Sequence, residues 1–263
     1  MKKLNIIKIG GNIIDDELQL EEFIHTLAKL NEPFILVHGG GKLATDLAMQ
    51  LNISQEIIDG RRVTNVETLK IAAMVYAGYI NKNIVALLQK YSRNSIGLSG
   101  ADANVIQTKK RNSEPINFGF VGDLTSDSVN ITFLKLLIEH GVTPVICAIT
   151  HDGNGQLLNT NADSIANAIA VSLSRSFDTQ LIYCFEKNGV LYHPEDENSV
   201  IPLLDWPMFQ TLKSQGIISK GMLPKLENCF QALEQKVGKV GIINAKNING
   251  YINNKTHEGT TIQ

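Results

Sequence analysis

Short apolar segments of β-strand length alternate along this chain with longer segments of helical periodicity, and this alternation restricts the fold more than any other feature. The apolar segments comprise residues 4–9, 34–38, 143–149, 181–185 and 239–243. Strands made of continuous apolar runs are usually covered on both faces, and strands that alternate with helices usually form parallel sheets. The sequence therefore predicts an α/β fold, a three-layer sandwich around a mainly parallel central sheet.

Polar residues or glycines precede the helical segments and indicate where the helices begin. Asp15-Asp16 precedes one amphipathic segment, Gly39-Gly40-Gly41 a second, and Asn65 the longest one. Residues 52–64 lack a helical period, so we expect a hairpin there. Further elements are expected as strands at 95–98 and 118–121 and as helices at 131–140, 205–214 and 222–235.

Composition excludes several classes of function. A net charge of -2 gives no reason to expect nucleic acid or an anionic membrane as a partner. No apolar run is expected to reach the length of a membrane span, and the N-terminus lacks the apolar core of a signal peptide. Cys147, Cys184 and Cys229 are scattered, which indicates reduced core residues and no metal cluster. We therefore expect a cytoplasmic protein without a protein-bound metal centre.

The first apolar segment contains Lys8 and ends in Gly10-Gly11. A lysine in a buried strand is costly to desolvate unless an anion meets it. Two glycines at the strand exit let backbone amides approach a ligand. This pattern indicates a phosphate site, because ligands of such folds lie at the carboxyl ends of strands. The alternative is a surface lysine followed by an ordinary turn.

Two common phosphate motifs are absent from the sequence. There is no GxxxxGK[ST], and no GxGxxG follows a strand. These absences disfavour Walker-type NTPases and Rossmann dehydrogenases. No serine, cysteine or histidine nucleophile with its base is evident, and His38, which ends a strand, is more often a structural histidine than a base in such a position.

Three separated elements can supply the chemistry of phosphoryl transfer: Lys8, the turn Asn159–Asp163, and Lys225. In that reaction the protein mainly positions the reactants and neutralises charge on the moving group. An aspartate between two lysines would hold both in place and keep them protonated. The alternative for Asp163 is that it only caps the helix after it, and both roles are compatible.

With these residues the chain resembles the acetylglutamate kinases of the amino acid kinase family. The resemblance extends over nearly the whole chain, and five motifs in this order make it specific. They are Ile7–Gly11, Val37–Gly41, Gly60–Thr64, Leu158–Asp163 and Gly221–Lys225. The resemblance implies the amino acid kinase type of fold. It also implies transfer of the ATP γ-phosphoryl group to the side-chain carboxylate of an N-acylated glutamate, in arginine biosynthesis.

The resemblance also implies residue roles. Lys8 and Lys225 would stabilise the transition state, Asp163 would organise them, and Gly10 and Gly11 would offer amides to the phosphoryl group. The acylated amino acid would be bound by Gly40, Gly41, Arg62 and Asn159. Glu186, Gly189, Gly216, Gly221 and Met222 would line the binding site for ATP with Mg²⁺. Residues 1–175 would form the substrate-binding and dimerisation lobe, and residues 176–263 the ATP-binding lobe.

The sequence departs from the family pattern at three places. Phe185-Glu186-Lys187 stands where relatives usually have Thr-Asp-Val, and Arg61 stands where they often have leucine. Arg61, with Lys42, is favoured as surface charge. The alternative is that it meets a second carboxylate on a succinyl group. The C-terminus also lacks the arginine often seen after Gly-Thr.

Other functions remain open at this point. They are kinases of carbamate, aspartate or a nucleotide, and a non-catalytic nucleotide-binding regulator; the pair of lysines with Asp163 argues against the last.

Only three residues precede the first strand, so the N-terminal helix that arginine-inhibited relatives use to form hexamers is not seen. The resemblance then implies a homodimer without that control. We expect the long helix beginning near Asn65 to form its interface, because small and aromatic residues on it can pack against a symmetry mate.

Overall fold

The computed structural model describes residues 1–58, 61–193, 195–218, 222–253 and 259–263, and leaves the side chain of Arg61 undescribed. Its centre is an eight-stranded sheet with the strand order β12-β14-β13-β11-β1-β2-β8-β5. The strands of this sheet are β1 (Lys3–Ile9), β2 (Phe34–His38), β5 (Ser95–Leu98), β8 (Thr143–Cys147), β11 (Asp178–Phe185), β12 (Leu203–Leu204), β13 (Lys239–Asn244) and β14 (Gly259–Ile262).

Six neighbouring strands of the sheet, from β13 to β5, are parallel, whereas β14 runs antiparallel to β13 and pairs in parallel with β12. β1 lies between β11 and β2, with Lys8 opposite Tyr183 on one side and Val37 on the other. The carboxyl ends of β1, β2 and β11 therefore meet at one edge of the sheet. The predicted mainly parallel sheet is confirmed.

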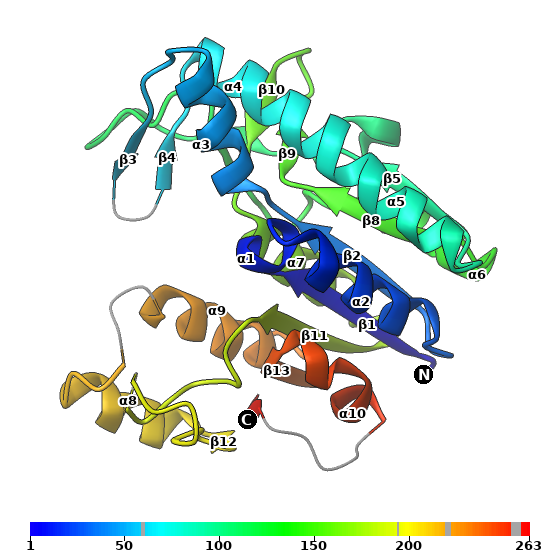
Figure 1. Ribbon diagram of the computed structural model, residues 1–263, viewed down its shortest axis with the longest axis vertical. Coiled ribbons are helices and arrows are strands. Elements are labelled where there is room, and N and C mark those ends of the chain that lie inside the picture. Colours follow the sequence, from blue (N-terminus) through cyan, green and yellow to red (C-terminus); the bar gives the residue numbers. More distant parts are fainter. Residues whose placement is uncertain (59–60, 194, 219–221, 254–258) are drawn as a thin grey trace.

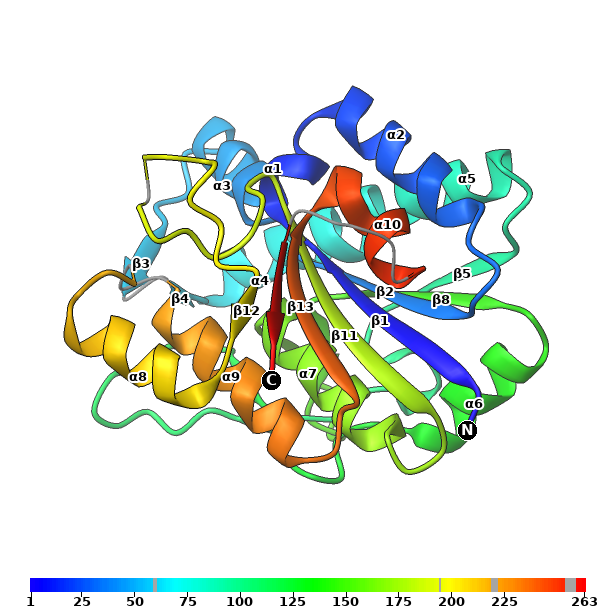
Figure 2. The same cartoon turned by 90° about the horizontal axis from the view of Figure 1, so that it is seen from below.

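Helices cover both faces of the sheet, as the two views in Figures 1 and 2 show. One face carries α2, α5 and α10; α6, α7 and α9 lie on the other. The predicted three-layer sandwich is thus confirmed. The helices are α1 (Gly11–Ile14), α2 (Glu17–Ala28), α3 (Gly41–Gln50), α4 (Val66–Ala72), α5 (Asn81–Lys90), α6 (Ile131–Glu139), α7 (Ala162–Leu173), α8 (Trp206–Ser214), α9 (Leu223–Glu234) and α10 (Ile248–Ile252).

Smaller elements lie between the main strands and helices. In the described residues, three short antiparallel pairs lie outside the central sheet. They are formed by β3 (Glu56–Ile58) with β4 (Arg61–Val63), β6 (Lys109–Lys110) with β7 (Gly122–Asp123), and β9 (Ile149–His151) with β10 (Leu157–Asn159). The β3–β4 pair is the hairpin expected within residues 52–64. Two single turns of 3-10 helix are η2 (Asp102–Asn104) and η3 (Ala245–Asn247).

Several helix starts follow from local side-chain chemistry. The carboxylate of Asp16 accepts hydrogen bonds from the amides of Leu18 and Gln19 at the start of α2. The Asn65 side chain accepts from the Thr68 amide at the start of α4. Both caps satisfy amides that have no partner within the helix. The predicted starts of these two helices are confirmed.

The predicted strand at 118–121 is wrong. Gly119 and Val121 form only isolated bridges, to Thr64 and Asn159. Gly119 has a φ of 74°, and a side chain there would meet the Thr64 carbonyl, so this backbone bends where a strand would have to stay extended. The expected strand 143–149 is divided between β8 and β9.

A continuous helix of 25 residues, Val66–Lys90, joins α4 to α5 through the π-helical segment η1 (Ala73–Ile80). By length and composition alone it could cross a membrane, so the expectation that no apolar run reaches that length is wrong. The position of the helix in the fold explains its apolar character, because Ile71, Val75, Ile80 and Ile84 are buried against the core.

Candidate active site

Lys8, Asp163 and Lys225 come together from three elements. Lys8 lies near the carboxyl end of β1, Asp163 in the first turn of α7, and Lys225 in the first turn of α9. The Lys8 Nζ lies 2.8 Å from Asp163 Oδ1, and the Lys225 Nζ lies 3.8 Å from Asp163 Oδ2. Lys8 and Lys225 are separated by more than 200 positions in the sequence, and the fold brings them to the same carboxylate, as the sequence predicted.

The electrostatics of this cluster (Lys8, Asp163 and Lys225) favour a charged aspartate. Burial alone would raise the pKa of Asp163, but the positive charges of Lys8 and Lys225 outweigh burial and hold this pKa below its usual range. Burial lowers the pKa of Lys225, and Asp163 opposes that shift. The three side chains are only 12–18% exposed, so the excess positive charge is poorly screened by water. Such a site attracts an anion.

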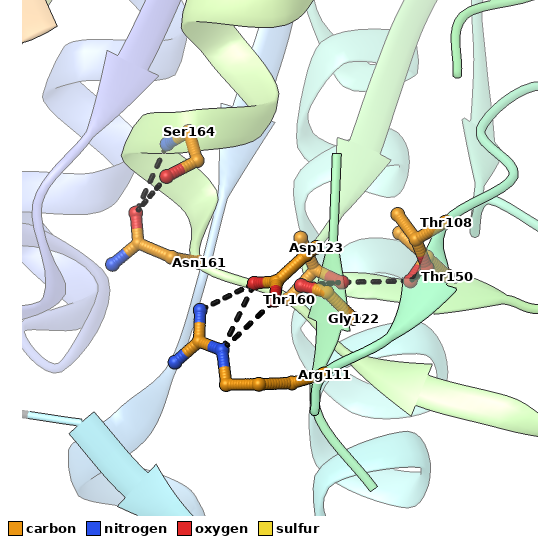
Figure 3. A network of polar contacts seen from close by, with 8 residues as sticks. All are labelled: Thr108, Arg111, Gly122, Asp123, Thr150, Thr160, Asn161 and Ser164. Carbon is orange, nitrogen blue, oxygen red and sulfur yellow. Dashed lines mark hydrogen bonds and ion pairs between the residues drawn. The ribbon is translucent and has the colours of Figure 1, made fainter. Parts of the chain in front are cut away.

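Asp163 does not cap the helix in whose first turn it lies. The side chain of Asn161 accepts the hydrogen bond from the Ser164 amide and therefore caps α7 (Figure 3). The interpretation of Asp163 as a cap is therefore wrong. Its carboxylate is left to pair with the two lysines.

The aromatic ring of Phe185 lies beside both lysines, and sequence reasoning missed its involvement. Its centroid is 3.7 Å from the Lys225 Nζ and 5.1 Å from the Lys8 Nζ. A Cβ placed on Gly10 would lie 3.1 Å from the Phe185 ring and 3.2 Å from the Cys184 carbonyl oxygen. Gly10 thus leaves room for this ring.

The two glycines after β1 differ in what their amides can bind. The Gly10 amide donates to the Cys184 carbonyl at 2.9 Å and extends the β1–β11 pairing. The prediction that it faces a phosphoryl group is therefore not supported. Gly11 is the first residue of α1, and a Cβ there would meet nothing within 4 Å. The open space beside it is compatible with a ligand close to the backbone.

Arg62 belongs to the second group of predicted site residues, those expected to bind the acylated amino acid, and its side chain lies near the start of α3. Its guanidinium donates to the Gly41 carbonyl at 2.8 Å and to the Thr45 hydroxyl at 2.7 Å, and it also contacts the Gln55 side-chain oxygen. These acceptors are all neutral. Among the described residues no carboxylate forms an ion pair with Arg62, so its charge stays available for an anion.

Gly40 and Asn159 flank this arginine from other elements. Gly40 has a φ of 145°, and a Cβ there would lie 2.1 Å from an Ile80 side-chain atom, so only glycine fits. The Asn159 side chain donates to the Thr64 hydroxyl at 3.1 Å. Thr64 in turn follows β4, which carries Arg62, so the asparagine and the arginine are tied to one segment.

The residues predicted to line the nucleotide lie in different structural settings. Glu186 is exposed and accepts a hydrogen bond from the Asn12 side chain at 2.8 Å. Gly189 and Gly216 have φ values of 156° and 68°, and Gly216 follows α8 in the left-handed conformation typical of helix ends. Backbone geometry therefore explains both glycines without a ligand. Met222 precedes α9 directly, and Gly221 lies outside the described residues.

His38 is buried and fully hydrogen-bonded. Its Nδ1 lies 2.9 Å from the Gly39 carbonyl and its Nε2 lies 3.0 Å from the Asn81 amide nitrogen. Burial lowers its pKa to about 4, so the ring is neutral at neutral pH. These contacts agree with the structural role favoured from the sequence.

A chain of three buried hydroxyls lies behind the Asn159–Asp163 turn, and no sequence signal pointed to it (Figure 3). Thr108 contacts Thr150 at 2.8 Å, and Thr150 contacts Thr160 at 2.7 Å. These threonines are at most 4% exposed. The network braces the turn between the predicted substrate residue Asn159 and Asp163.

Comparison with known proteins identifies the family of the chain. The amino acid kinase family matches residues 3–244. The acetylglutamate kinase of Cytophaga hutchinsonii is 49% identical over 263 residues, 100% of this chain and 99% of that protein. The acetylglutamate kinase of Phocaeicola vulgatus is 48% identical over 248 residues, 94% of this chain and 96% of that protein.

A solved structure shares the fold. The N-acetylglutamate synthase of Neisseria gonorrhoeae, in complex with coenzyme A and N-acetylglutamate, superposes with a TM-score of 0.83 at 18% identity. The match covers 98% of this chain and 59% of that one. From the family match and the full-length relatives, the chain belongs to the amino acid kinase family.

Proposed function

We propose that this chain is an N-acetyl-L-glutamate kinase. It transfers the γ-phosphoryl group of ATP to the side-chain carboxylate of N-acetylglutamate, giving an acyl phosphate and ADP for arginine biosynthesis. The observation that carries the proposal is the pairing of Asp163 with both Lys8 and Lys225. The two full-length relatives that carry this enzyme name support it.

The reaction needs charge neutralisation more than proton transfer. A glutamate side chain has an ordinary pKa of about 4.3 and is already ionised at neutral pH. One of its oxygens forms the new bond to the γ-phosphorus while the bond to the ADP oxygen breaks. Lys8 and Lys225 lower the repulsion between the two anions, and Asp163 holds both ammonium groups. The Gly11 amide is the further donor that we assign to the phosphoryl group.

ATP with Mg²⁺ is the proposed cofactor pair. The cluster of two lysines with one aspartate carries net positive charge, which fits the γ-phosphoryl group. No group of three acidic, histidine or cysteine side chains suited to a metal occurs in the described part of the chain. This fits Mg²⁺ bound chiefly through nucleotide phosphates and water. Glu186, Gly189, Gly216, Gly221 and Met222 remain the proposed nucleotide lining.

Arg62 is proposed to bind the α-carboxylate of the acylated amino acid, with Gly40, Gly41 and Asn159 around it. We expect Arg62→Gln to raise the KM for N-acetylglutamate about ten- to a hundredfold, because a charge-assisted hydrogen bond is worth about 1.5–3 kcal/mol. The KM for ATP should not change. Lys42→Gln, which removes a neighbouring exposed cation, is the control. Equal effects of the two substitutions on KM would contradict the assignment.

The lobe division follows the same assignment. Residues 1–175 are proposed to bind the acylated amino acid and to form the dimer, because Arg62 and Asn159 belong to them. Residues 176–263 are proposed to bind ATP. The active-site lysines then come one from each lobe.

A homodimer in the cytoplasm, with no nucleic acid or membrane partner, completes the proposal. Met74 and Tyr79 on the long helix are 55% and 60% exposed, which favours this helix as the interface. We expect light scattering to give twice the chain mass and Tyr79→Glu to give the chain mass alone. Leu136→Glu, at an equally exposed apolar residue of α6, should leave the dimer intact. A monomeric parent chain would refute the interface.

Trapping the acyl phosphate with hydroxylamine tests the function directly. The purified chain with ATP and Mg²⁺ is compared on N-acetylglutamate, N-succinylglutamate, aspartate and carbamate. We expect the highest kcat/KM with N-acetylglutamate. Preference for the succinyl compound would keep the mechanism and reassign the acyl group, whereas activity on none of the four would refute the proposal.

A further inference from the structure

The two active-site lysines lie beside one aromatic ring and share one carboxylate. Lys8 pairs closely with Asp163 at 2.8 Å, but Lys225 is 3.8 Å away from the same carboxylate. The Lys225 Nζ is nearer to the centre of the Phe185 ring, at 3.7 Å. An ammonium group at this distance from a ring face is attracted by the negative charge of the π-system.

The surroundings fix the position of this ring. Phe185 is the last residue of β11 and stacks on the buried Tyr183, with centroids 6.5 Å apart and planes at 11°. The two rings project from the same face of the strand, as residues two apart do. Gly10 leaves space for the ring, because a Cβ on this residue would lie only 3.1 Å from a ring carbon of Phe185. The ring thus has little freedom to leave the lysines.

An aromatic ring has a different electrostatic effect here from a second carboxylate. Asp163 alone leaves the three charged groups with one net positive charge. A second acid in direct ion-pair contact with Lys225 would cancel that charge, which the reaction needs for the incoming phosphoryl group. Glu186 acts on Lys225 electrostatically, but it is exposed and its carboxylate accepts a hydrogen bond from Asn12. A ring holds the ammonium group and adds no net charge.

We propose that Phe185 is a positioning residue that holds Lys225, and more weakly Lys8, through the face of its ring while leaving their charge available to the phosphoryl group. This inference rests on the proposed kinase function. The ring acts through the two lysines that it contacts.

Substitutions of Phe185 in the full chain test the proposal. Phe185→Leu keeps an apolar side chain and removes the ring, whereas Phe185→Tyr keeps the ring. We expect Phe185→Leu to lower kcat for N-acetylglutamate phosphorylation about three- to thirtyfold, equivalent to about 0.7–2 kcal/mol at 1.36 kcal/mol per tenfold. The KM for both substrates should stay within about twofold, and Phe185→Tyr should retain most of kcat. Tyr91→Leu, which removes a ring 5.4 Å from Lys90 at the end of α5, is the matched control and should leave kcat unchanged.

A second measurement does not depend on activity. Protons above an aromatic ring face resonate upfield, so the Lys225 side-chain resonances, assigned with Lys225→Arg, should be shifted upfield in the parent chain. The shift should persist in Phe185→Tyr and vanish in Phe185→Leu. Circular dichroism and melting curves confirm that the variants fold.

The outcomes separate this inference from the proposed function. A parent chain without kinase activity would refute the function, and the lysine resonances would still decide the contact. An active parent with unchanged kcat in Phe185→Leu would overturn the inference alone. A selective rise in the KM for ATP would also overturn it, because the ring would then contact the nucleotide.

Discussion

Lys8→Met is expected to lower kcat about a hundred- to a thousandfold or more, the largest single effect on turnover that the structure implies. Removing one preorganised donor from a developing negative charge costs this much in other enzymes. Lys8 is only 12% exposed, so water cannot replace its ammonium group easily. Lys225→Met should act in the same direction. Steady-state kinetics with saturating ATP and N-acetylglutamate measure both.

The comparison must separate lost charge from lost folding. Lys90→Met removes another ion-paired lysine, but its carboxylate partner Glu21 lies on the surface, so kcat should stay unchanged. Thermal melting of the three variants shows whether each folds. If Lys8→Met or Lys225→Met kept near-normal kcat, the role of that lysine in the transition state would be wrong.

Long-range convergence at the site could be predicted because it follows from strand order. In a parallel sheet the carboxyl ends of the strands lie at one edge, where the helices that lead back to the next parallel strands begin. Lys8, near the end of β1, was therefore expected to meet the first turns of α7 and α9 there. Helix starts at Asp16 and Asn65 could also be predicted, because their side chains satisfy amides only a few residues away. The helix caps are local signals, and the alternation of strands and helices repeats along the chain, so both can be read from the sequence.

Other features depend on contacts that sequence spacing does not encode. Both Asn161 and Asp163 can cap a helix, and only the backbone of the turn decides that Asn161 does. The Gly10 amide could face a ligand or a neighbouring strand, and it pairs with Cys184. Phe185 appears in the sequence as one more apolar strand residue. Its position over two lysines depends on α9, which begins 38 residues later.

Asp163→Asn should destabilise the fold as well as reduce activity. It removes the negative charge between two poorly exposed lysines, and an unpaired buried charge costs about 3 kcal/mol. For a chain of this size that corresponds to a fall in Tm of about 5–10 °C. Asp127→Asn removes an exposed carboxylate, whose only recorded hydrogen bond in the described residues comes from Ser126, and should leave Tm unchanged. Differential scanning calorimetry at neutral pH measures both.

The difference in Tm between the parent chain and Asp163→Asn should depend on pH, because the pKa of Asp163 is lowered in the folded chain. A carboxyl group whose pKa is lower in the folded than in the unfolded chain stabilises the fold at pH values above its unfolded pKa. That contribution is lost as the pH falls through the folded pKa, which the two lysines hold below its usual range. The Tm difference between the parent chain and Asp163→Asn should therefore be constant from about pH 8 to pH 5 and shrink below about pH 4. A difference that grew towards acid pH would contradict the ion pairing.

A double variant identifies the cause of the instability. In Asp163→Asn the cost arises from the lysines left without a counter-charge, and burial disfavours the charged form of Lys225 in particular. Adding Lys225→Met removes that cation and replaces it with an apolar side chain of similar length. The double variant should therefore melt at a higher temperature than Asp163→Asn alone, although it has lost one more polar group. If it melts lower, then packing around Asp163, and not the charge balance of the two lysines, holds this part of the fold together.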